Sequence, residues 1–150
     1  MTLGVVLMAV ACSGGSTQHT SVGSHGHNVS VFRLKKGDCV VPPTTVKAEI
    51  SQVEVVPCTT AHTQEVFGMA DYKSDTYPGP SALKSFADGA CLQQYAGYVG
   101  VDYRDSSLFY TYLLPSARSW NSDVLNDRRV VCLVTTTGQT LYSPVKGSGR

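Results

Sequence analysis

The segment Val53-Glu54-Val55-Val56-Pro57-Cys58-Thr59-Thr60-Ala61-His62-Thr63-Gln64-Glu65-Val66-Phe67-Gly68 decides the fold of this chain. Two short runs rich in β-formers flank a Pro-Cys turn and a polar His-Thr-Gln-Glu stretch. Pro57 has no N–H for a strand ladder, so we expect the first strand, residues 52–56, to end there. The pattern predicts a strand, a corner anchored by Cys58, and a returning strand over residues 63–72.

The sequence on either side of this corner predicts more strands and one long helix. Pro80 at a helix start is followed by apolar residues at intervals of three and four, which predicts a helix that ends at Gly100 and turns Cys91 toward the core. Ser116 is the expected N-cap of a short helix or turn leading to Trp120, which we expect to be partly buried. The remaining strands are predicted at residues 29–34, 39–41, 108–114 (as a central strand), 129–135 and 141–145 (as an edge strand), before a fraying tail at residues 147–150.

Five cysteines in 150 residues indicate a disulfide framework with one further thiol. No C-x-x-C occurs and no histidine pair lies at ligand spacing beside a cysteine pair, so the spacing does not favour zinc. Four cysteines allow three pairings. We favour Cys39 with Cys58 and Cys91 with Cys132, whereas a Cys39–Cys91 bond would overturn the predicted topology. The expected fold is therefore α+β, with an antiparallel sheet packed on one main helix and stapled by two disulfides.

The fifth cysteine, Cys12, follows a short apolar run that ends in small residues. Such a run is too short to span a bilayer but suits the core of a signal peptide. The pattern resembles the bacterial lipobox, in which Cys12 would become the diacylglycerol-modified N-terminus. Leucine is more usual at the position of Ala9, and no basic residue precedes the run, which suggests a start upstream of Met1. We predict a signal-peptide remnant at 1–11, a lipidated flexible tether at 12–28 and a folded domain at 29–150.

The charge pattern gives no indication of a polyanionic partner. The formal net charge is +1 and no basic or acidic block occurs, so nucleic acid is not an expected partner. The pairs Lys35-Lys36 and Arg128-Arg129 are expected on solvated surfaces.

His62 and Glu65 are the best catalytic candidates, because a histidine and a carboxylate can serve as a base and its orienting group. The chain contains no Gly-x-Ser-x-Gly, no phosphate loop and no His-Glu-x-x-His, and the predicted domain contains no free cysteine. We therefore expect a structural role, with His62 bonded to a turn beside Cys58 and Glu65 exposed on its strand.

Several short motifs occur in an order that is similar to a known family. They are Gly37-Asp38-Cys39, Val56-Pro57-Cys58 with His62 and Glu65-Val66-Phe67, Tyr77-Pro78-Gly79, Cys91, Leu114-Pro115 with Ser119-Trp120, and Asp127-Arg128 leading to Val131-Cys132-Leu133. Together they resemble the septum formation domain family, found largely in actinobacterial membrane-attached and lipoprotein chains, over about residues 37–148. Family members often carry glycine where Asn126 stands. The resemblance implies an envelope-facing domain linked to cell division, and no active site accompanies it.

These observations predict a non-enzymatic lipoprotein outside the cytoplasm, anchored to the membrane by its N-terminal lipid. It would bind a division protein, another envelope protein or a cell-wall polymer, without a cofactor or metal. His62, Glu65 and Trp120 are the candidate interaction residues. The alternative is an envelope hydrolase or metal-dependent enzyme that uses His62 and Glu65.

Overall fold

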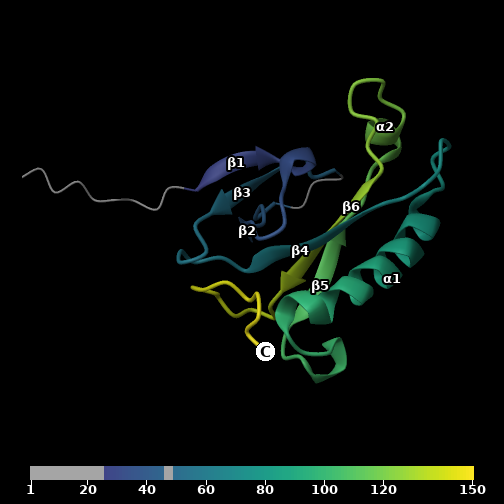
Figure 1. Ribbon diagram of the computed structural model, residues 1–150. Coiled ribbons are helices and arrows are strands. Elements are labelled where there is room, and N and C mark those ends of the chain that lie inside the picture. Colours follow the sequence, from purple (N-terminus) through teal and green to yellow (C-terminus); the bar gives the residue numbers. More distant parts are fainter. Residues whose placement is uncertain (1–25, 46–48) are drawn as a thin grey trace, which may run out of the picture.

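The computed structural model of the chain describes residues 26–45 and 49–150, in which six strands form one antiparallel sheet (Figure 1). The strand order is β1-β3-β2-β4-β6-β5, and helix α1 packs on one face. The strands are β1 (His27–Ser30), β2 (Cys39–Val41), β3 (Gln52–Val56), β4 (Gln64–Asp71), β5 (Phe109–Leu113) and β6 (Arg129–Thr135). The helices are α1 (Pro80–Val99), the short α2 (Ala117–Trp120), and the 3-10 turns η1 (Val31–Arg33) and η2 (Tyr103–Asp105). The predicted α+β class is confirmed.

Alternation along β6 divides the apolar residues between two cores. Val130, Cys132 and Val134 pack with α1, whereas Val131 and Leu133 belong to a second cluster. This second cluster includes residues of β2 and β3 and lies on the other side of the sheet, because successive strand side chains point to opposite faces. In Figure 1 the β1–β3–β2 end of the sheet lies on the opposite side of β4 and β6 from α1.

Helix α1 has the predicted bounds. Gly79 (φ 87°) precedes Pro80 at the first helical position, and Gly100 (φ 92°) ends the helix in the left-handed conformation that glycine adopts without strain. The face predicted from the three-and-four spacing is the buried one: Leu83, Ala87, Cys91, Tyr95, Tyr98 and Val99.

The two predicted disulfides are formed. Cys39–Cys58 ties the start of β2 to the corner after β3, and Cys91–Cys132 ties α1 to β6. Each bond therefore joins elements that hydrogen bonding or packing already brings together.

Three predicted strands need correction. β1 ends at Ser30 because the chain turns through η1 and buries Leu34 in the second core, and it begins at His27, inside the predicted tether. The aromatic strand near residue 110 is β5 at the sheet edge, not a central strand. Residues 141–145 form only one bridge, between Leu141 and His62, since Pro144 has no N–H to continue a ladder.

The C-terminal tail is held by α1 instead of fraying as predicted. The N–H groups of Gly147 and Gly149 donate to the carbonyls of Tyr98 and Val99 at 2.8 and 2.9 Å. Carbonyls at a helix end have no partner within the helix, so the tail satisfies two of them.

No helix within the described residues is both long and apolar enough to cross a bilayer. The predicted signal-peptide remnant and Cys12 lie outside these residues.

We expect removal of the Cys91–Cys132 bond to destabilise the domain more than removal of Cys39–Cys58. The pairs are 41 and 19 residues apart, and the chain-entropy model gives about 4 and about 3 kcal/mol for such loops. Urea unfolding of the Cys91→Ala/Cys132→Ala and Cys39→Ala/Cys58→Ala variants measures both costs. An equal or larger loss for the second pair would contradict this ranking.

Candidate functional site

Glu65 is buried beneath the disulfide corner, contrary to the prediction that it is exposed. Its side chain is 1% exposed, Oε1 accepts from the Tyr98 hydroxyl at 2.5 Å, and Oε2 accepts from the Val145 N–H at 2.7 Å. Burial, followed by the hydrogen bond to Glu65, raises the pKa of the Tyr98 hydroxyl well above its ordinary value, so Tyr98 remains a neutral donor. Glu65 therefore connects β4, α1 and the tail.

His62 is equally buried and forms the predicted turn contact. Nδ1 lies 2.7 Å from the Thr60 carbonyl oxygen, which can only accept, so the neutral ring carries its proton on Nδ1. Nε2 is buried and has no hydrogen-bond partner among the described residues. The backbone of His62 bonds in both directions with Leu141, at 3.1 and 2.8 Å. These contacts fix the corner against the tail.

The sulfurs of Cys39 and Cys58 and a carboxylate oxygen of Glu65 lie within 4.8 Å of one another. Thiolate and carboxylate ligands at this spacing would suit a metal, but the sulfurs are bonded to each other. An intact disulfide offers no thiolate, so this cluster is not a metal site while the bond persists.

The structure brings a second group of polar side chains together around Trp120. The Arg128 guanidinium stacks on the indole with its carbon 4.0 Å from the ring centroid. Its Nε donates to the Ser74 carbonyl at 3.0 Å and its Nη1 to the Trp120 carbonyl at 2.8 Å, while the indole N–H donates to the Asp75 carbonyl at 3.2 Å. We call Trp120, Arg128 and the residue 74–75 carbonyls the clasp, since they fix the loop after β4 to α2.

α2 is fixed by a capping box and by contacts with distant residues. The Ser116 hydroxyl accepts from the Ser119 N–H, and the Ser119 hydroxyl accepts from the Ser116 N–H, both at 3.0 Å. The Ser116 hydroxyl also donates to Glu49 at 2.6 Å, and the Ser119 hydroxyl donates to Asp127 at 3.3 Å. Ser116 is thus the N-cap of α2, as predicted.

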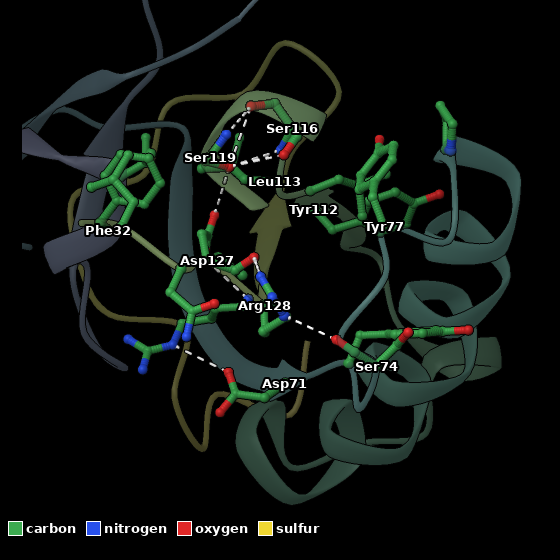
Figure 2. A pocket seen from close by; sticks show the side chains of 18 of the residues that line it. Phe32, Asp71, Ser74, Tyr77, Tyr112, Leu113, Ser116, Ser119, Asp127 and Arg128 are labelled. Carbon is green, nitrogen blue, oxygen red and sulfur yellow. Dashed lines mark hydrogen bonds and ion pairs between the residues drawn. The ribbon is translucent and has the colours of Figure 1, made fainter. Parts of the chain in front are cut away.

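A groove of about 770 Å³ opens beside the clasp. Figure 2 shows Phe32 on one side, Tyr77 on the other and Arg128 between them. The lining includes an apolar set from η1, β5, β6 and the segments before β3 and β6: Val31, Phe32, Ile50, Leu113, Leu125 and Val131. Acidic and basic residues also line it in similar numbers: Glu49, Asp71, Asp75, Asp127, Lys73, Arg128 and Arg129. This mixture suits a ligand with both apolar and hydrogen-bonding groups and no large net charge.

The three predicted interaction residues are buried and do not lie on the surface. His62, Glu65 and Trp120 are each 1% exposed. Arg128, predicted on a solvated surface, is half-buried on Trp120, whereas its neighbour Arg129 is exposed. Sequence reasoning missed the groove, although Ser119-Trp120 and Asp127-Arg128 both stood among the family motifs.

We expect Tyr98→Phe to lower the free energy of unfolding by about 1–3 kcal/mol, because it removes a donor from a buried carboxylate. The midpoint of urea unfolding measures the loss. Tyr142→Phe is the matched control, since this tyrosine is 65% exposed, and should leave the midpoint unchanged. A Tyr98→Phe midpoint equal to the control would contradict the proposed role of Glu65.

Comparisons with known proteins agree with the family resemblance that the sequence motifs indicate. A Mycobacterium bovis protein named "Putative lipoprotein LppN" is 32% identical over 123 residues, which cover 79% of this chain and 63% of that protein. The chain thus spans less than two thirds of this relative's length. No solved structure matches the chain. The septum formation family model matches residues 7–149, and the chain belongs to this family.

Proposed function

We propose that the chain is a non-enzymatic, lipid-anchored domain of the cell envelope that binds a protein or cell-wall polymer in the groove beside the clasp. The groove is the observation that carries this proposal, because it joins an apolar lining to a rigid polar wall. The family's association with septum formation supports a role in cell division.

Three observations support the proposed location. A relative is named as a lipoprotein, and Cys12 follows the small residues expected before a lipidated cysteine. The two disulfides suit an oxidising compartment outside the cytoplasm. Under this proposal the tether holds the domain close to the outer surface of the membrane.

The clasp gives the groove a preorganised wall. Arg128 is held by stacking and by bonds from Nε and Nη1, which limits the ordering cost when a partner binds. Its Nη2 makes no hydrogen bond within the described part of the chain, and we propose that it donates to a carbonyl, carboxylate or hydroxyl of the partner. The half-buried Phe32 and the exposed Leu125 would contact the partner's apolar groups.

The hydrogen bonds of His62 and Glu65 give both residues a structural role that does not require catalysis. Both carboxylate oxygens of Glu65 accept hydrogen bonds, and the His62 Nδ1 proton is engaged by Thr60. Neither side chain lines the groove. This arrangement supports the non-enzymatic proposal over a hydrolase that uses the two residues.

A photoreactive residue in place of Lys73, on the groove, should capture the partner in intact envelopes. We expect Leu125→Asp to reduce the adduct about tenfold or more, because it places an unpaired charge against the partner's apolar groups. The adjacent Val124→Asp is the matched control: Val124 is 91% exposed and does not line the groove. A protein partner gives a discrete band, and a wall polymer gives material that muramidase digestion shortens.

Equal effects of the Leu125 and Val124 variants, or the absence of any adduct, would contradict binding in the groove. Thermal unfolding of both variants verifies that each is folded. The adduct's composition then identifies the partner's class.

His62→Ala distinguishes the structural role from the enzymatic alternative. We expect it to lower the free energy of unfolding by about 2 kcal/mol or more, because it removes a buried side chain and its bond to Thr60. Urea unfolding measures this loss, and partner capture should persist in the fraction that remains folded. A fully stable variant that loses hydrolysis of cell-wall material would instead favour catalysis.

A further inference from the structure

The outer edge of β5 is an unpaired strand edge. β5 pairs only with β6 and ends the strand order. Apart from that ladder, the backbone of residues 109–113 makes no hydrogen bond in the described residues. None of its five residues is buried, whereas five of the seven in β6 are. An edge of this kind presents N–H and C=O groups to another strand.

β5 lacks the features that usually prevent edge pairing. Its sequence, Phe-Tyr-Thr-Tyr-Leu, contains no charge and no proline, and its register with β6 runs without a bulge. Proteins commonly protect an exposed edge with lysine, proline or a bulge. The aromatic residues instead favour cross-strand pairing.

The sequence of β5 is also nearly symmetric about Thr111. In an antiparallel pair centred there, Tyr110 lies opposite Tyr112 of the other copy and Phe109 lies opposite its Leu113. We propose that two copies of this chain pair through β5 about a two-fold axis at Thr111, extending the sheet across both copies. A two-fold axis requires a self-complementary surface, and this strand meets that requirement.

Each face of the extended sheet would gain matched contacts. Tyr110 and Tyr112 pack with the α1-side core, so their cross-axis pairs lie on that face. Phe109, Thr111 and Leu113 lie on the other face, where Leu113 contacts the second core. Phe109 is 45% exposed, and pairing would cover it with Leu113 of the other copy.

Lys84 and Asp88 of α1 form an ion pair within one copy, with Nζ 2.8 Å from Oδ2, so neither charge requires a partner across the axis. The Tyr110 hydroxyl donates to the backbone carbonyl of Asp88 at 3.3 Å, which holds this tyrosine on the α1 side of the sheet. The choice of a second copy as the partner therefore rests on the self-complementary sequence of β5.

Native mass spectrometry and sedimentation equilibrium of the full 150-residue chain test the pairing. We expect a dimer that Thr111→Lys and Thr111→Glu each weaken about tenfold or more, because residues directly opposite at the axis acquire like charges. Mixing the two variants should restore a heterodimer, identified by its mass. Val124→Lys and Val124→Glu, in the exposed loop after α2, should dimerise like the unaltered chain.

A chain that is monomeric up to about 1 mM would overturn the proposal. So would dimers that resist both Thr111 variants, a mixture that fails to recover dimer, or equal weakening by the Val124 variants. Circular dichroism of each variant verifies the fold, and recovery on mixing excludes unfolding as the cause of a loss. A monomer whose β5 edge binds only an unrelated extended peptide would also overturn it.

Discussion

The buried carboxylate of Glu65 joins three parts of the chain that are distant in sequence. It lies on β4, accepts from Tyr98 at the end of α1, and accepts from the backbone of Val145 in the tail. A buried carboxyl group is costly unless it is hydrogen-bonded, so these two donors stabilise the burial of Glu65 and link the three parts. The adjacent Cys39–Cys58 bond and the bridge between His62 and Leu141 hold the same corner. This end of the molecule is therefore fixed by a disulfide, by side-chain hydrogen bonds and by backbone hydrogen bonds together.

The clasp fixes the chain in a similar way at the opposite end of β4. Arg128 spans from Trp120 to the Ser74 carbonyl, so α2 and the loop after β4 are held as one wall. Asn126 permits the turn that leads to this arginine, because its φ of 43° lies in the left-handed region that asparagine tolerates better than most residues. Conformation at residue 126 and the position of the guanidinium are thus linked.

Local patterns in the sequence predicted most of the helices and strands but fewer of the contacts between them. The bounds of α1, β3 and β6 followed from Pro80, Gly100 and Pro57 and from strand-forming residues, which act through nearby backbone geometry. The burial of Glu65 was missed because its donors lie 33 and 80 residues away. The edge position of β5 was missed for a related reason: an aromatic strand resembles a central one, and only the strand order distinguishes them. The groove depends on Phe32 of η1 meeting Leu125 and Arg128 of the segment before β6, which is distant in sequence, and no spacing rule encodes this contact.

The proposed binding groove lies beside the clasp at one end of β4, and the proposed pairing surface runs along the edge strand β5. Because Glu65 and Arg128 brace opposite ends of β4, the groove and the β5 edge both belong to a scaffold that does not need to rearrange when it binds. Leu113 lines the groove and also ends β5, so pairing at the edge would place Phe109 of a second copy next to the groove wall. Partner binding and self-association would then share a boundary at Leu113, and each would alter the surface available to the other. Two membrane anchors on one dimer would further restrict both grooves to positions close to the same membrane surface.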